Sequence, residues 1–263
     1  MDYKKILLAI FLVFFLLICG CVKTYQEMRI KSDLSGSIHV KLVFDLDVLG
    51  KSLLLQRFGA NMTLDQLGDF EKKLQDVTSL REGAKKILKA NVRYQKAKIL
   101  RQLPTKVKLA NFKLEKAEYN QMVLRIELRF SHINDLNKMK NLVFTTPKTK
   151  NQFEFFKELK FISTKRSITI YQKIENNRHV AYGVKNSLLP QLRKVFDEFV
   201  QNLGIYFRIR CPYVKYRVYK HNCDYYDRKN HTLYWGYTSK KMVKYIKSNK
   251  QPKPVYVKLN KRR

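Results

Sequence analysis

Four residues near the C-terminal end carry side chains that could do chemistry together: Cys211, His221, Cys223 and Asp224. Thiolates, imidazoles and carboxylates bind zinc, but the spacing of these four differs from the common zinc patterns. If Cys211 and Cys223 lie on facing strands of a hairpin, an oxidising compartment would allow a disulfide, provided that their Cα atoms are about 4.4 to 6.8 Å apart. We therefore expect this disulfide, with two separate thiols as the alternative, and no metal site.

The remaining candidates for catalysis are carboxylates. The chain has no glycine-rich phosphate loop, no Gly-x-Ser-x-Gly turn and no His-Glu-x-x-His pair. General acid and base groups need a shared cleft and separated pKa values, whereas the acids here fall on predicted helix or strand surfaces as solvated or ion-paired groups: Asp45, Asp47, Asp65, Asp69, Asp197 and Glu198. We predict a protein that is not an enzyme and binds no cofactor.

Cys21 follows a leader that is typical of exported proteins. Two lysines precede an unbroken apolar run over residues 6–18, which is shorter than the roughly 20 residues that a membrane span needs. The sequence Ile18-Cys19-Gly20-Cys21 then resembles the lipobox of bacterial lipoproteins. This resemblance implies that residues 1–20 are a signal peptide that is removed, and that the Cys21 thiol receives a diacylglycerol. An uncleaved anchor or a buried segment is the alternative.

Lipid attachment at Cys21 would decide where the protein acts. Two or three acyl chains, of palmitate for example, hold a protein on a membrane where one chain is marginal, because each buried CH₂ contributes about 0.8 kcal/mol. We therefore expect a membrane-anchored, extracytoplasmic protein of the cell envelope. The sequence does not indicate which membrane or surface carries it, or its oligomeric state.

The chain is strongly basic. It has 54 Lys and Arg against 21 Asp and Glu, a formal net charge of +33, and such a surface attracts anions. A basic stretch covers residues 85–101. The mixture of tyrosine and lysine over residues 208–247 could bind nucleic acid by stacking and charge, but an exported protein meets anionic lipid or cell-wall polymer first. We expect no nucleic acid partner. A lysine-biased genome is the alternative explanation of the charge.

The hydropathy pattern predicts an α+β fold with antiparallel sheets built from hairpins and two main amphipathic helices packed on them. Strands are expected where apolar and polar residues alternate: residues 22–31, 38–46, 112–116, 122–130, 153–162, 167–174, 205–219, 231–237 and 255–259. The helices are expected over residues 63–80 and 188–203. Residues 21–239 form the extracytoplasmic domain in this interpretation, and residues 240–263 form a basic C-terminal segment.

The order of these elements resembles the LppM-type group of bacterial lipoproteins. The matching features are the lipobox, the turn Leu34-Ser35-Gly36, the strand over residues 123–130, Cys211-Pro212-Tyr213-Val214, Asn222 and Thr232-Leu233-Tyr234-Trp235. The resemblance implies an α+β domain outside the cytoplasmic membrane that binds lipid or another envelope ligand. This chain departs from the group in its charge and its long basic middle.

We therefore expect a lipid-anchored, non-catalytic envelope protein that binds an anionic or amphiphilic envelope component. One alternative is a surface adhesin for acidic glycans, which proteolysis of intact cells would distinguish by its orientation. The other alternative is an envelope hydrolase, which would require a deep polar cleft with converging carboxylates or histidines.

Overall fold

The computed structural model describes residues 22–58, 64–118, 120–141, 143–145, 152–154, 159–174, 204–212, 214–248 and 252–262. The N-terminal half contains β1 (Val22–Ile30), β2 (Gly36–Asp45), α2 (Leu46–Phe58), α3 (Leu64–Gln75), α4 (Val77–Gln102), β3 (Val107–Lys116), β4 (Gln121–Phe130) and the 3₁₀ helix η1 (Ile133–Asn141). The C-terminal half contains β5 (Val143–Thr145), β6 (Gln152–Glu154), β7 (Leu159–Ser163), β8 (Ser167–Gln172), β9 (Gly204–Arg210), β10 (Tyr216–His221), β11 (Tyr225–Asp227), β12 (Thr232–Thr238), α7 (Ser239–Lys247) and β13 (Val255–Lys261).

The larger sheet has seven strands in the order β11-β12-β9-β1-β2-β4-β3. Two predicted hairpins are confirmed, because β1 pairs antiparallel with β2 and β3 pairs antiparallel with β4. The expectation of purely antiparallel sheets is wrong, because β1 runs parallel to β9. The fold is therefore mixed α and β with one mixed sheet. Parallel neighbours need a long connection, and here residues 31–203 lie between the two strands.

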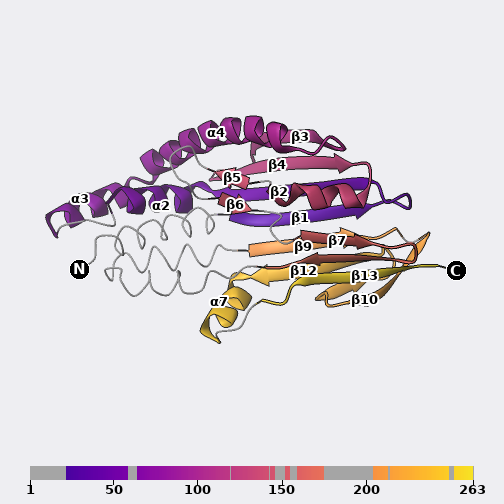
Figure 1. Ribbon diagram of the computed structural model, residues 1–263. Coiled ribbons are helices and arrows are strands. Elements are labelled where there is room, and N and C mark those ends of the chain that lie inside the picture. Colours follow the sequence, from indigo (N-terminus) through magenta and orange to yellow (C-terminus); the bar gives the residue numbers. More distant parts are fainter. Residues whose placement is uncertain are drawn as a thin grey trace, which may run out of the picture.

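The second sheet has four strands in the order β10-β13-β8-β7. The predicted last strand over residues 255–259 is confirmed as β13, which pairs with both β10 and β8. The strand expected over residues 153–162 instead covers two strands, β6 and β7, that belong to different sheets. The segment 240–263, which the composition separates from the domain, thus supplies an inner strand of this sheet (Figure 1).

One hydrophobic core joins the two sheets. Alternate residues of each strand point inward, as the period of two requires, so that Met28, Ile38 and Leu128 of the larger sheet belong to the same cluster as Ile168 and Val257 of the smaller one. The inward set predicted for β4 is confirmed, since Met122, Leu124, Ile126, Leu128 and Phe130 are all buried. The opposite face of the larger sheet carries mostly polar side chains, with Val43 and the buried Val123 as apolar exceptions.

The helices α2 and α3 lie at one end of the larger sheet, and α4 extends along it beside β3 (Figure 1). The single helix expected over residues 63–80 is wrong: α3 ends at Gln75, and Asp76 caps α4 by accepting a hydrogen bond from the Ser79 N–H at 3.0 Å. The helix expected over residues 188–203 lies outside the described residues. No helix in the described part of the chain is long and apolar enough to cross a membrane.

The basic stretch that follows is also helical. The weak pattern over residues 81–109 predicts a short helix and a strand, but residues 77–102 form the 26-residue helix α4. Its buried side, with Ala84, Leu88, Gln95 and Ile99 at spacings of four or seven, follows the helical period. The small Ala84 and the polar Gln95 on this buried side weaken the hydropathy signal for a helix.

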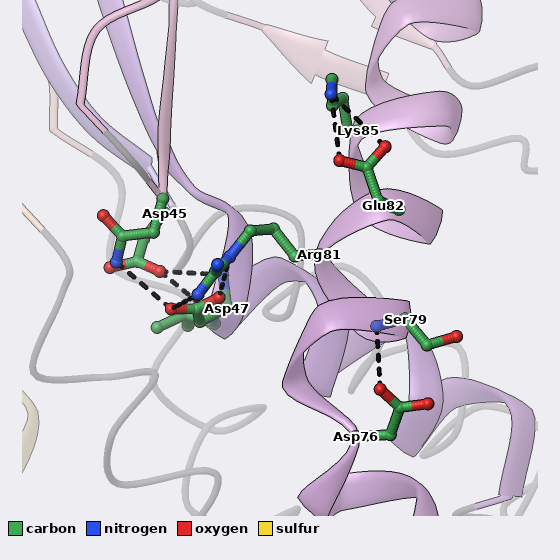
Figure 2. Close-up of polar contacts among 9 residues, drawn as sticks. Asp45, Asp47, Asp76, Ser79, Arg81, Glu82 and Lys85 are labelled. Atoms are coloured by element: carbon green, nitrogen blue, oxygen red, sulfur yellow. Dashed lines mark hydrogen bonds and ion pairs between the residues drawn. The ribbon is translucent and has the colours of Figure 1, made fainter.

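An ion pair ties α4 to the start of α2 (Figure 2). Arg81 donates to the Asp47 carboxylate from Nε at 2.8 Å and from Nη2 at 3.0 Å, and Asn120 Nδ2 donates to the same group at 3.3 Å. Neighbouring Asp45 caps α2 by accepting hydrogen bonds from the N–H groups of Asp47 and Val48. Asp45 and Asp47, two of the carboxylates that could be candidates for acid–base chemistry, therefore make structural contacts.

The Asp47→Asn variant is expected to lose about 2 kcal/mol of stability near neutral pH, because a hydrogen-bonded charge pair is replaced by a neutral amide. Burial alone would raise the pKa of Asp47, but the bonds from Arg81 and Asn120 lower it below its ordinary value. A lowered pKa stabilises the fold above the unfolded-state value of about 3.9, and this contribution disappears as the pH falls through the folded-state pKa. Urea titrations at pH 6 and pH 3 check this. A difference between the two proteins that stays constant over that range would contradict the pairing.

The crossing of α2 and α4 depends on a glycine. A Cβ at Gly50 would lie 2.7 Å from the backbone oxygen of Leu80 and 2.9 Å from its Cβ, whereas a Cβ at Gly83 of α4 would meet nothing within 4 Å. We expect Gly50→Ala to destabilise the protein by about 1 to 2 kcal/mol, because overpacking exceeds the gain in helix propensity. Gly83→Ala is expected to stabilise it by about 0.5 to 1 kcal/mol. Thermal unfolding of both variants checks the opposite signs, and equal shifts would contradict the close crossing.

Candidate anion-binding surface

The outward face of the larger sheet, which we call the polar face, presents cations and tyrosines in cross-strand rows. Strand register places residues of one row directly opposite each other. One row runs Arg210, Arg29, Ser37, Arg129 and Lys108, and the next runs Tyr234, Arg208, Glu27, His39, Glu127 and Asn111. A third row runs Tyr206, Tyr25, Lys41, Arg125 and Lys113. The face is therefore predominantly basic.

Tyrosine rings pack among these cations. Tyr25 and Tyr206 stack with ring centroids 4.8 Å apart, and Lys41 Nζ lies 5.5 Å from the Tyr25 ring. The Arg208 guanidinium lies 5.2 Å from the ring of Tyr234. Cation–π contacts of this kind hold long cationic side chains against the sheet, so the positive charges of Lys41 and Arg208 have restricted positions.

Each carboxylate of these three rows, and that of Glu115 beside them, is bound by arginine. Glu27 accepts from Arg29 Nε at 2.7 Å and contacts Arg208 Nη1 at 3.5 Å. Glu127 accepts from Arg129 Nε at 2.8 Å, and Glu115 accepts from Arg125 Nε. The charges of these paired glutamates and arginines thus neutralise one another.

Burial alone would raise the pKa of Glu27, but the hydrogen bond from Arg29 and the nearby charge of Arg208 lower it. The hydrogen bonds from Arg125 and Lys113 likewise lower the pKa of Glu115. Both carboxylates therefore stay ionised at neutral pH. Among the described residues, Lys23, Lys108 and Arg210 have no carboxylate partner. Positive charge thus remains on the polar face after every internal pair is formed.

At one end the polar face is hollowed into a groove of about 610 Å³, which we call the arginine groove. Its cationic lining residues are Arg29, Lys31, Arg129 and Arg210, and Glu127 is its carboxylate. The turn between β1 and β2 and the segment after β9 form its walls, with Ser32 on the first and Pro212 on the second. Three strands that are distant in sequence therefore direct guanidinium groups to one concave site.

The predicted thiol pair lies beside this groove. Cys211 lines it and is 5% exposed, Cys223 is half-buried, and both thiols are free. Burial raises the pKa of Cys211 to about 12, with a smaller effect of Cys223, and burial also raises the pKa of Cys223. Since the thiolate is the reactive form, neither cysteine resembles a nucleophile. The disulfide between them stays a prediction.

Thiol labelling distinguishes the two states. In the reduced, folded protein we expect Cys223 to react with a maleimide at least about tenfold faster than Cys211, because access and thiolate fraction both favour Cys223. Alkylation of unfolded, non-reduced protein taken from its native compartment then shows whether the pair is bonded, since a disulfide resists the reagent. Equal labelling rates in the folded protein would contradict the burial of Cys211.

The other two residues of the predicted cluster, His221 and Asp224, have different partners. His221 stays close to the thiols, with Nδ1 3.1 Å from Cys223 Sγ. Asp224 instead accepts a hydrogen bond from the Gly236 N–H at 2.7 Å and forms an ion pair with Lys241 at 2.9 Å. Among the residues that the structure describes, no three His, Cys, Asp or Glu side chains are placed to hold a metal ion.

The remaining site candidates fall as follows. Cys21, the predicted lipidation residue, lies outside the described residues, as do Asp197 and Glu198. Asp69 is exposed on α3. The alternation of residues 122–130 and 205–210 predicts outward positions for Arg129 and Arg210, but it does not predict that they meet Arg29. Alternation gives the face of a residue, whereas the meeting of three strands depends on their pairing.

Comparison of the chain with known proteins shows a weak likeness to solved structures and no sequence match. No family model matches the chain, and no curated protein matches it. Among solved structures, the chain is similar to the NMR structure of the folded domain of LppM from Mycobacterium tuberculosis, with a TM-score of 0.36 and 8% identity over 92% of this chain and 90% of that chain. A likeness at this TM-score carries no argument about ligand or function.

Proposed function

We propose that the chain is a lipid-anchored lipoprotein of the cell envelope, attached through Cys21, that binds an anionic envelope component without catalysing a reaction. The observation that carries the binding role is the polar face, whose carboxylates are already bound by arginines while further cations have no carboxylate partner among the described residues. Uncompensated positive charge on a fixed scaffold attracts an external anion.

The start of β1 supports attachment without a spacer. β1 begins at Val22, the residue after Cys21, and it is an inner strand between β9 and β2. An acylated Cys21 would hold this end of the larger sheet close to the bilayer surface. The α2 helix begins near the same end, since Val22 pairs with Phe44 and α2 follows β2 directly. The α4 helix begins beside it, since Arg81 of α4 pairs with Asp47 of α2.

The outer side of α4 is a second basic surface suited to a bilayer. Glu82 is its only carboxylate and is paired with Lys85 at 3.0 Å, while Lys86 and Arg93 are exposed. Ile87 and Tyr94 are each 45% exposed and lie two helical turns apart on one side. Exposed apolar residues flanked by cations are typical of interfacial helices, and each basic residue gains about 1 kcal/mol near anionic lipid.

The anchor is tested by mass spectrometry of the mature amino terminus from the native host. We expect a diacylated or triacylated Cys21 as the first residue. The Cys21→Ser variant is expected to lose the lipid and to leave the membrane fraction after a high-salt wash, which removes charge-based contacts. An unmodified Cys21, or a serine variant that is cleaved and partitions as the parent does, would overturn the anchored role.

Binding is tested by sedimentation with neutral and anionic vesicles. The unlipidated protein is expected to bind anionic vesicles alone, and the triple variant Lys86→Glu, Lys89→Glu and Arg93→Glu is expected to bind them at least about tenfold more weakly. The matched control carries Arg217→Glu, Lys220→Glu and Lys229→Glu, the same charge change at exposed positions on and beyond β10. Equal losses of affinity in both triple variants would show that binding depends only on net charge. Equal binding to neutral and anionic vesicles would overturn the proposal.

A further inference from the structure

We propose that the arginine groove binds a phosphate group, as a phosphomonoester or phosphodiester of an envelope molecule. This inference rests on the proposed function and names the chemical group that the anionic component presents. The groove, rather than the whole basic surface, is the specific site. The contacts of its three arginines carry the argument.

The three arginines come from neighbouring strands in one row. Arg210, Arg29, Ser37 and Arg129 are successive register partners across β9, β1, β2 and β4. Because neighbouring strands are about 4.8 Å apart, Arg29 and Arg129 start about 10 Å apart with Ser37 between them. The long side chains of Arg29 and Arg129 can thus contact one bound phosphate group above Ser37.

Two glutamates leave the ends of two guanidiniums available. Glu27 accepts from Nε of Arg29 at 2.7 Å, and Glu127 accepts from Nε of Arg129 at 2.8 Å. Each pair lies two residues apart on one strand. In the described part of the chain, the terminal amino groups of Arg29 and Arg129 donate to no protein acceptor, and Arg210 has no partner. The glutamates therefore orient two guanidiniums through Nε and leave the pair of terminal amino groups of each arginine to bind phosphate.

The number of donors favours phosphate over a single carboxylate. One guanidinium satisfies the two oxygens of a carboxylate, whereas the groove presents three guanidiniums, Lys31 and the Ser32 hydroxyl. The Ser37 hydroxyl also lines the groove and shares a hydrogen bond with His39 Nε2 at 2.8 Å. A phosphomonoester carries about 1.5 to 2 negative charges at neutral pH and three strong acceptor oxygens. Ile30, Pro212 and Val214 also line the groove, so apolar surface is available for the organic part of the ligand.

The test measures small ligands on the full-length protein in a neutral detergent, because long polyanions would bind any strongly basic surface. Calorimetry compares glycerol phosphate, a short-chain phosphatidylglycerol, a short polyol phosphate and a galacturonate oligomer. We expect the phosphate ligands to bind and Arg210→Gln to weaken them about tenfold or more. Arg217→Gln, at an exposed position of β10, is the matched control and is expected to change little.

Several outcomes separate this site from the general function. Tighter Arg210-dependent binding of the lipid or of the polyol phosphate supports the groove and identifies the source of the phosphate. Phosphate affinities that Arg210→Gln leaves unchanged, in a variant whose urea midpoint equals that of the parent, overturn the groove. Tighter binding of galacturonate also overturns it. In either case, binding of anionic vesicles through α4 would still support the proposed function. The proposed function itself would fail if the protein did not bind anionic vesicles, or if Cys21 were unmodified.

Discussion

The Gly36→Ala variant is expected to lose about 3 kcal/mol or more of stability, because the added methyl group has no space. A Cβ at Gly36 would lie 2.0 Å from the backbone oxygen of Arg29 and 2.7 Å from Cζ of Phe130. The Arg29 oxygen belongs to the central hairpin, where Gly36 pairs with Ile30 and Phe130. Relieving the clash therefore requires β2 to shift against both β1 and β4. Urea unfolding followed by circular dichroism measures the loss.

The Gly83→Ala variant is the matched control, since it adds the same methyl group in open space. An unfolding midpoint for Gly36→Ala equal to that of the parent would contradict the close approach of β2 to Arg29. The turn itself places its left-handed residue at Leu34, with φ 68°. Gly36 is therefore required by contact with its neighbours and not by a positive φ angle.

The Asn222→Ala variant is expected to lose about 3 kcal/mol, because it removes the side chain that joins the two sheets and leaves buried donors unpaired. Asn222 Oδ1 accepts from Trp235 Nε1 at 2.9 Å and from the Tyr256 N–H at 3.1 Å. Its Nδ2 donates to the Pro254 carbonyl at 2.7 Å. Trp235, in β12, is 3% exposed and is the single tryptophan, so its fluorescence reports the unfolding.

Two variants sharpen this test. Asn222→Asp keeps both acceptor bonds but loses the donor to Pro254, so its loss of stability is expected to fall between those of the parent and the alanine variant. Asn134→Ala, at an exposed position in η1, is expected to stay within about 0.5 kcal/mol of the parent. If Asn222→Ala and Asn134→Ala had equal midpoints, Asn222 would not connect the sheets.

The hairpins were predictable because their information is local. In β4, apolar residues from Met122 to Phe130 alternate with Arg125, Glu127 and Arg129, and the structure buries the first set and leaves the second on the polar face. Period-two alternation places each side chain on a face without reference to distant residues. The strand β13, predicted from Val255, Val257 and Leu259, is confirmed for the same reason.

The helices were less predictable because packing outweighs their local signals. α2 has Gly50 and Ser52 within its sequence, which lower helix propensity, yet Asp45 caps it and Gly50 allows α4 to cross closely. Nothing in the hydropathy of residues 47–58 predicted this helix. Hydropathy does not predict the continuous helix α4, because the polar Gln95 interrupts the apolar pattern of its buried side.

The amino-acid sequence alone determined the alternating strands, the polar and apolar faces of each, and the leader pattern from which lipid attachment at Cys21 is predicted. Only the tertiary structure decided that β1 lies parallel to β9, that β13 enters between β10 and β8, and that Arg29, Arg129 and Arg210 meet in one groove. The reason is physical: side-chain direction follows from neighbouring residues, whereas strand order depends on burying one shared core from segments far apart in the chain.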